Sequence, residues 1–362
     1  MVKTSAKIEI NPLLIKKLRE SVGYSKEALV KKGVVKNLKK IEDVESGKDS
    51  FTLNQLKKLV NIYRIPLAAL FTEEIPKLPE IPDYRINREK KLTHEVYFAI
   101  RRASYLSSKL FELTKKQNQI PYFPEDLNAK DLANAFKKYL NLKPLKSKKP
   151  AKILEFYKKI LEEKLLILII EYPLKADDVR AFSILSDISV IVLNEQDESQ
   201  IKLFSTFHEI CHLLKKSGGV CSIEVDNKQR PEVEFYCDEF AAEFLVPQDI
   251  IHMEVERVGT DNKGVADLSK IFGVSKQVIM LRLLKLGHIR LNSYRQFKER
   301  FDEEKIKKKK FGRRKWEKVY FNRAGNLAIQ EVSNAYKKGD ITFLESAEIL
   351  NLKAKYVEKF VT

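Results

Sequence analysis

Apolar residues in the first seventy positions recur every three to four residues, which is the period of an amphipathic helix. Ser25 and Thr52 stand directly before two of these runs, where a hydroxyl can cap the first turn of a helix. Residues 11–71 therefore predict five short helices in a compact helix-turn-helix bundle. The repeating positions are Leu14, Leu18, Ala28, Leu29, Leu53, Leu56, Leu59 and Val60.

The pattern is interrupted twice before the middle of the chain. Pro76, Pro79 and Pro82 are spaced three residues apart, which opposes a helix and predicts an extended linker over 75–83. Lysines and prolines over 143–150 predict a second boundary. Two helices are expected between these boundaries, at 88–116 and 127–140.

The central part of the chain mixes two periods. Continuous apolar runs at 165–170 and 189–193 predict two buried strands. Helical spacing predicts helices at 153–161, at 200–215 and at 231–245, and Pro247 ends the last of them. A loop with Gly218 and Gly219 is expected between the second and third. This alternation predicts an α+β domain built on a small sheet.

The remainder of the chain is expected to be helical. Residues 265–286 show a second helix-turn-helix rhythm around Gly273, and residues 327–360 predict three further short helices. Between them, 305–318 forms a dense basic block around Phe311 and Trp316.

The predicted fold class is α+β with five segments along the chain. An all-α helix-turn-helix bundle comes first, an α+β domain with a small sheet is central, and a helical region ends the chain. The segments are 1–74 (helix-turn-helix), 75–150 (proline linker and helical connector), 151–255 (central α+β domain), 256–300 (helix-turn-helix-like) and 301–362 (basic helical region).

Composition narrows the function classes. The 362 residues are 44% hydrophobic and 33% charged, as in a globular protein. The longest apolar run, 165–170, is far too short to cross a membrane, and no secretory signal is expected. Three cysteines do not make a disulfide framework, so a cytoplasmic location is expected. The net charge of +18 favours nucleic acid as a partner, although lysines that only keep the surface soluble would give the same value.

The sharpest chemical signal is the H-E-x-x-H motif at residues 208–212. On a helix, His208 and His212 lie one turn apart on one face, so both imidazoles can reach one zinc ion. Glu209 comes next to the first histidine, where it can take a proton from a water molecule. The motif therefore predicts His208 and His212 as metal ligands and Glu209 as the catalytic base.

A catalytic zinc ion needs a third protein ligand. Glu234 and Asp238 form an E-x-x-x-D pair on the next predicted helix, with both carboxylates on one face. We expect Glu234 to ligate the metal and Asp238 to accept the free N–H of a liganding histidine. Two alternatives stay open at this point. Asp238 replaces Glu234 as the ligand, or cysteines complete a structural Cys2His2 site; Cys211 is expected in the core.

Two parts of the chain resemble known families. Residues 8–72 resemble the Xre/Cro-repressor type of helix-turn-helix, through Ile41–Lys48, Thr52–Leu59 and Ile65–Leu67. The later block resembles the ImmA/IrrE family of metallopeptidases, which implies that residues 151–255 form a gluzincin-like zinc metallopeptidase domain with a small sheet. The residues that carry this second resemblance are Arg180–Ser183, Phe204–His212 and Glu234–Pro247.

The resemblance implies a cytoplasmic regulator that holds Zn²⁺ and cleaves a repressor-like protein, with DNA bound through the N-terminal domain. Lys36, Lys39 and Lys40 are the DNA-binding candidates. The stretch 34–40, which is expected to hold the recognition helix, is shortened, rich in lysine and without a small polar residue at its start. Position 181 is alanine where the family usually has glycine, and position 238 is aspartate where asparagine is common.

Two other function classes compete with proteolysis. One is a DNA-binding regulator whose metal site is sensory or structural, and the other is an antitoxin that sequesters a partner. Glu209 favours the peptidase, because a structural site has no use for a general base. Tyr236 and His252 are candidates to stabilise the oxyanion, and neither is preferred. The strand at 189–193 could offer its edge to an extended substrate.

Overall fold

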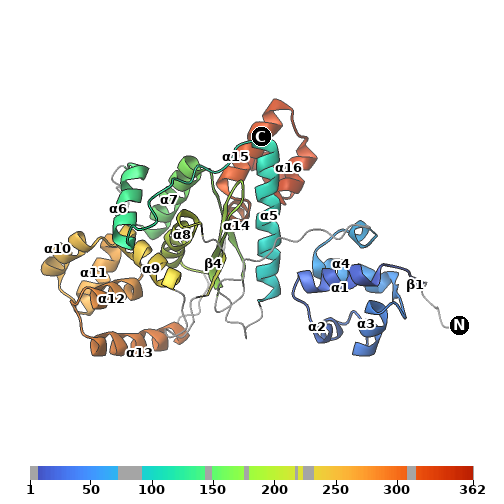
Figure 1. Ribbon diagram of the computed structural model, residues 1–362, viewed down its shortest axis with the longest axis horizontal. Helices are drawn as coiled ribbons and strands as arrows, with labels where there is room; N and C mark the ends of the chain where they lie inside the picture. Colours follow the sequence, from blue (N-terminus) through green and yellow to red (C-terminus); the bar gives the residue numbers. More distant parts are fainter. Residues whose placement is uncertain are drawn as a thin grey trace. The chain divides into compact units, whose positions relative to one another are not determined.

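The computed structural model describes residues 7–71, 92–142, 149–174, 179–216, 219–222, 232–307 and 315–361. The side chains of 219–222 and 301–307 are not described. The chain divides into two compact units, shown in Figure 1: residues 1–80 with 88–101, and residues 81–87 with 102–362. Helix α5, His94–Thr114, contributes to both.

The first unit is helical, with one short pair of antiparallel strands. Its elements are β1 (Lys7–Ile8), α1 (Pro12–Ser21), α2 (Lys26–Lys31), α3 (Leu38–Glu45), β2 (Phe51–Thr52), α4 (Leu53–Tyr63), the 3₁₀ helix η1 (Leu67–Leu70) and the start of α5. The apolar positions that predict these helices, such as Leu14, Leu29 and Leu56, are buried in its core.

Local capping explains where two of these helices begin. The Ser25 hydroxyl accepts the backbone N–H of Ala28 at the start of α2. Thr52 and Gln55 form a reciprocal capping box at the start of α4. Both caps were expected from the sequence and are confirmed. The five predicted helices correspond to four α-helices and one 3₁₀ helix, and their assignment as a helix-turn-helix stays a prediction.

The start of α3 corrects one expectation. Helix α3 begins only at Leu38, and the Asn37 side chain accepts the backbone N–H of Lys40 at 3.0 Å. Asn37 is thus the small polar cap that the sequence interpretation missed. The preceding residues 32–37 form turns and bends, so 34–37 is not helical.

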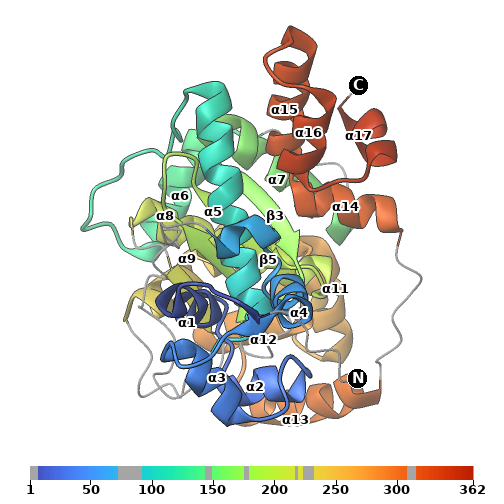
Figure 2. The same cartoon turned by 90° about the vertical axis from the view of Figure 1, so that its right-hand side faces the viewer.

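A four-stranded mixed sheet organises the second unit, in the order β3-β5-β4-β6. Strand β5 pairs in parallel with β3 and antiparallel with β4, and β4 pairs antiparallel with the edge strand β6. Figures 1 and 2 show α8 on one face of this sheet and the part of α5 beyond Arg101 on the other. The strands are β3 (Leu168–Tyr172), β4 (Val179–Ile184), β5 (Val190–Asn194) and β6 (Gly219–Ser222).

Two strands were predicted, and their positions need correction. Helix α7, Pro150–Leu165, runs into the apolar run at 165–170, and Leu166 ends it with a left-handed backbone at φ 50°. Strand β3 therefore starts at Leu168, and β5 starts one residue after Ser189. The prediction misses β4 and β6, because their residues show neither an alternating pattern nor a continuous apolar run.

The helices beside the sheet are α6 (Ala129–Leu140), α7, α8 (Ser199–Leu214) and α9 (Glu232–Leu245). Three of them lie within two residues of their predicted ends, whereas α7 begins three residues earlier and ends four residues later than the predicted 153–161. Aromatic side chains fill the space between them, and the rings of Phe207 on α8 and Phe244 on α9 stack at 4.0 Å. The start of α5 is corrected, since Leu92 and Thr93 precede the helix that was expected from residue 88.

Eight helices complete the described part of the chain. They are α10 (Gln248–Val258), α11 (Asn262–Phe272), α12 (Lys276–Lys285), α13 (Leu291–Lys307), α14 (Trp316–Ala324), α15 (Asn326–Lys338), α16 (Phe343–Leu350) and α17 (Ala354–Phe360). The pair α11–α12 and the three tail helices α15–α17 confirm the prediction. Helix α10 was not expected, because Pro247 reads as a stop signal whereas a new helix begins directly after it.

Some predicted features fall outside the described residues. These are the proline segment at 75–83, most of the boundary at 143–150, the glycine at 218 and the core of the basic block at 308–314. The division into five segments stays a prediction. Within the described residues, no helix combines the length and the apolar character needed to span a bilayer.

Candidate metal centre

Helix α8 carries the H-E-x-x-H motif into the core. Phe207 and Cys211 are fully buried among the neighbouring helices, and these contacts fix the rotation of α8 about its axis. His208 is 7% exposed and His212 is not exposed at all. Phe207 and Cys211 therefore mark a packing face of α8, and the two histidines lie beside it on the same helix.

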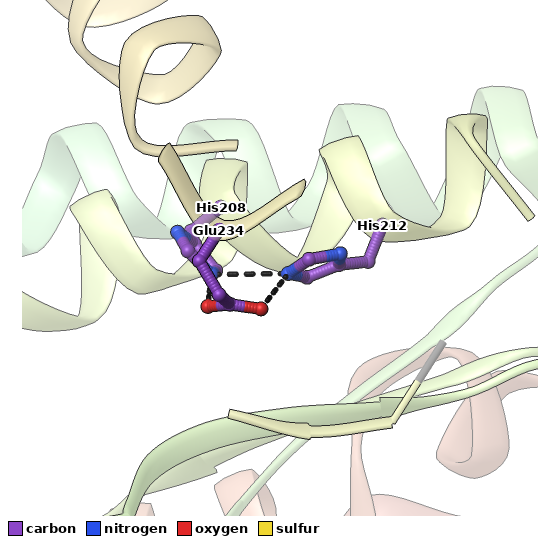
Figure 3. A group of neighbouring side chains, drawn as sticks. All are labelled: His208, His212 and Glu234. Carbon is purple, nitrogen blue, oxygen red and sulfur yellow. Dashed lines mark hydrogen bonds and ion pairs between the residues drawn. The ribbon is translucent and has the colours of Figure 1, made fainter. Parts of the chain in front are cut away.

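Helix α9 brings a carboxylate to the same place. Glu234 lies in its first turn and is 2% exposed. Figure 3 shows the Glu234 carboxylate directed at the imidazoles of His208 and His212. Burying a carboxylate with two imidazoles is costly unless a proton or a cation compensates the charge. The arrangement therefore favours a bound cation.

The donor atoms form a compact triangle. The two Nε2 atoms of His208 and His212 lie 3.1 Å apart. Glu234 reaches the Nε2 of His208 at 3.2 Å through Oε2 and the Nε2 of His212 at 3.4 Å through Oε1. Ligands about 2.0–2.1 Å from a tetrahedral zinc ion stand roughly 3.3 Å from each other. The triangle thus has the size that a tetrahedral metal ion requires.

Each histidine has a partner for its other ring nitrogen. The Nδ1 of His208 lies 2.8 Å from Oδ1 of Asp238, and the Nδ1 of His212 lies 3.2 Å from Sγ of Cys237. When Nδ1 carries the proton, Nε2 keeps the lone pair that a metal ion needs. Both Nε2 atoms therefore face the metal position.

The same contacts separate the alternatives left open by the sequence. Asp238 contacts the nitrogen of His208 that points away from Glu234, and the metal-sized cluster consists of His208, His212 and Glu234. Cys237 likewise meets the outer nitrogen of His212, and burial raises the pKa of its thiol. The geometry favours Glu234 over Asp238 and gives no support to a Cys2His2 site.

Glu209 lies one residue beyond His208 on α8 and is only 1% exposed. The two candidates for stabilising an oxyanion are engaged elsewhere. The Tyr236 hydroxyl donates to the Leu127 carbonyl at 2.6 Å, and Nδ1 of His252 lies 2.7 Å from Nε2 of His288. Their contacts therefore do not place either of them at the metal centre.

The contact between Cys237 and His212 was not predicted. Its signal is present in the sequence, because Glu234, Cys237 and Asp238 stand at positions i, i+3 and i+4 of one helix and share a face. The sequence interpretation places Cys211 in the core and considers Cys237 only as a ligand of a Cys2His2 site, so it misses the contact between the Cys237 thiol and His212.

The three lysines proposed for DNA contacts have different environments. Lys36 and Lys39 are exposed, before and within the first turn of α3. Lys40 donates to Asp49 Oδ2 at 2.5 Å and to the Ser50 carbonyl at 2.7 Å. With Lys7, it holds the pKa of Asp49 well below its usual range. Lys40 is thus tied to its own unit, and only the first two present uncommitted charge at the surface.

The family comparison agrees with this geometry. Residues 162–284 match the family Peptidase_M78, described as an IrrE N-terminal-like domain. The matched range runs from the end of α7 to α12 and contains all three residues of the metal-sized cluster. The match supports a relation to the ImmA/IrrE family and points to a metallopeptidase. A comparison with curated proteins finds no match.

Proposed function

We propose that the chain is a zinc-dependent endopeptidase that cleaves one specific partner protein, a DNA-binding repressor. The observation that carries the proposal is the buried triangle of His208, His212 and Glu234 within a block that matches a peptidase family. Two nitrogen donors and one oxygen donor are a ligand set typical of catalytic zinc, which keeps its fourth position for water.

His208, His212 and Glu234 would hold the zinc ion, which would supply Lewis-acid chemistry toward a water molecule and the substrate carbonyl. Glu209 would act as the general base that takes a proton from the water and passes it to the leaving amine. Asp238 holds His208, and Cys237 holds His212, with each Nε2 directed at the metal position. These contacts reduce the reorganisation that the ligands need.

A specific partner is proposed from the first unit. Its exposed lysines Lys36 and Lys39 and the net charge of +18 suit an interaction with DNA. A peptidase held on the DNA meets a DNA-bound repressor at high local concentration, without a need for tight binding in its own cleft. We accordingly expect efficient cleavage of one protein and little digestion of an unfolded substrate such as casein.

A regulator or an antitoxin with a purely structural metal site is the competing function. It has no need for a buried carboxylate beside the first histidine. The Peptidase_M78 match over 162–284 also favours the peptidase.

Cleavage tests the proposal directly. The zinc-loaded chain and its Glu209→Gln variant are incubated with repressors encoded near the gene and with casein, and products are identified by mass spectrometry. We expect a single cut in one repressor and a loss of about 10²-fold or more in the variant, because the amide cannot accept the proton. Equal cleavage by both proteins contradicts the role of Glu209, and digestion of casein into many fragments contradicts the specific partner.

A further inference from the structure

A cavity of about 340 Å³ lies in the second unit, apart from the metal centre. Its volume is within the range of about 300–1,000 Å³ that small-molecule sites occupy. Its walls come from α7, β3, the first turn of α8, and helices α14 and α15. His208, His212 and Glu234 do not line it.

The floor of the cavity carries buried charge. The ammonium groups of Lys158 and Lys202 contact the same carboxylate, Glu171, at 3.2 and 2.6 Å. All three side chains are close to nine-tenths buried or more. Burial alone raises the pKa of Glu171, but the two lysines outweigh it and hold the pKa at about 2. The ionised Glu171 thus faces two ammonium groups. Glu162 also lines the cavity, and burial raises its pKa to about 7, so it carries less negative charge than Glu171 at neutral pH.

A second pair of lysines contacts a single carboxylate at the edge of the cavity. Lys318 of α14 and Lys152 of α7 contact the two oxygens of Glu155 at 2.6 and 2.9 Å. Lys318 lines the cavity, whereas Lys152 does not. Four lysines line the cavity (Lys158, Lys159, Lys202 and Lys318), and three carboxylates line it (Glu155, Glu162 and Glu171), so the lining holds one more cationic side chain than carboxylates.

Neutral donors complete the polar wall. Helix α8 begins at Ser199, which lines the cavity, and no side chain caps its first turn. The positive end of the α8 dipole is therefore directed to this space. Asn322 and Gln330 add amide groups from the opposite side. Charged and neutral donors of this kind are the groups that bind phosphate.

The cavity also has an apolar side, formed by Leu154 and Phe321. We propose that it binds a small phosphorylated metabolite. The phosphate lies against Lys158, Lys202 and the first turn of α8, and the organic part lies against Leu154 and Phe321. A nucleoside monophosphate has the required combination of a dianion and a flat ring.

Occupation of this cavity has a consequence for the metal centre. Lys202 stands on α8 six residues before His208, and its backbone carbonyl accepts the Thr206 hydroxyl at 2.7 Å. A ligand on Lys202 therefore contacts the helix that carries the H-E-x-x-H motif. Control of cleavage by the ligand rests on the proposed peptidase function, whereas binding itself does not.

Calorimetry and thermal unfolding of the full chain test the proposal at constant ionic strength. The probes are adenosine monophosphate, inorganic phosphate and, as the uncharged control, adenosine. We expect saturable binding of adenosine monophosphate with a rise in Tm, and no effect of adenosine. Equal affinity for inorganic phosphate identifies free phosphate as the ligand, and weaker phosphate binding identifies the phosphorylated metabolite. Absence of saturable binding by both anions at millimolar concentration overturns the proposal.

Two variants locate the binding. Lys318→Ala and Lys152→Ala each remove one charge and one contact with Glu155, but only Lys318 lines the cavity. We expect about a fivefold or greater loss of affinity from Lys318→Ala and none from Lys152→Ala. Asn322→Asp adds a negative charge to the wall and should abolish binding, while the exposed control Asn334→Asp should not. Unchanged affinity in both Lys318→Ala and Asn322→Asp places the anion elsewhere and overturns the proposal, whatever the peptidase activity.

Discussion

At the scale of single residues, the candidate metal centre depends on side chains that contact the proposed ligands and not the metal position. The carboxylate of Asp238 fixes His208, while the weaker acceptor Cys237 meets His212. The residue types of the ligands could be predicted from sequence, because H-E-x-x-H specifies both spacing and helix. The helical spacing places Cys237 on the same face as Glu234, but its contact with His212 could not be predicted, because that contact depends on how α9 packs against α8.

Replacement of Asp238 tests the contribution of such a partner. Asp238→Asn keeps the size of the side chain but removes the charge that stabilises the Nδ1–H of His208. We expect zinc affinity to fall by about 10–100-fold, as measured by competition with a chelator. Glu239→Gln, on the exposed side of the same helix, is the control and should bind zinc as the wild type does. Equal affinities of the two variants would show that Asp238 does not support the site.

At the scale of elements, helices were predictable where apolar residues recur at helical spacing. Helices α8 and α9 lie within one residue of their predicted ends, and Asn128 and Thr342 cap α6 and α16. Strand β4 was not predictable, because its residues become a strand only through pairing with β5 and β6. Such pairing joins segments that are distant in sequence, and no local pattern records it.

The junction of α14 and α15 gives an element-scale prediction. Gly325 has a positive φ of 87°, and a Cβ there would stand 2.6 Å from Cδ1 of Leu168 on β3. Gly339 also has a positive φ, of 81°, but open space around it. We expect Gly325→Ala to lower the free energy of unfolding by about 1–3 kcal/mol more than Gly339→Ala. Urea denaturation measures both, and equal losses would show that α14 and α15 do not depend on this close approach to β3.

At the scale of the whole molecule, buried acids with opposite pKa shifts shape stability. Burial raises the pKa of Glu162 to about 7, whereas Lys158 and Lys202 hold that of Glu171 at about 2 despite its burial. Ordinary glutamate titrates near 4.5. The folded state therefore keeps the proton of Glu162 longer than the unfolded state does. The contribution of Glu162 to the free energy of unfolding is complete below about pH 4.5 and is lost as the pH rises through 7. The contribution of Glu171 is complete above about pH 4.5 and is lost as the pH falls towards 2.

Substitution of Glu162 tests how its raised pKa affects stability at neutral pH. Glu162→Gln mimics the protonated acid and should remove the decline between about pH 4.5 and 7. We expect it to raise the free energy of unfolding at pH 8 by about 1–3 kcal/mol, with little change at pH 5. Glu163→Gln, its exposed neighbour, is the control. A variant that is less stable than wild type at pH 8 would contradict the raised pKa.

The zinc content of the purified protein tests the candidate metal centre most directly. Protein purified without added metal is analysed by elemental mass spectrometry beside Glu234→Ala, His212→Ala and His252→Ala, with circular dichroism to verify the fold. We expect about one zinc ion per chain in the wild type and in His252→Ala, and a loss of most zinc in the other two variants. Less than roughly a tenth of an equivalent in the wild type after incubation with zinc, or equal content in all four proteins, would contradict the assignment of His208, His212 and Glu234 as the site.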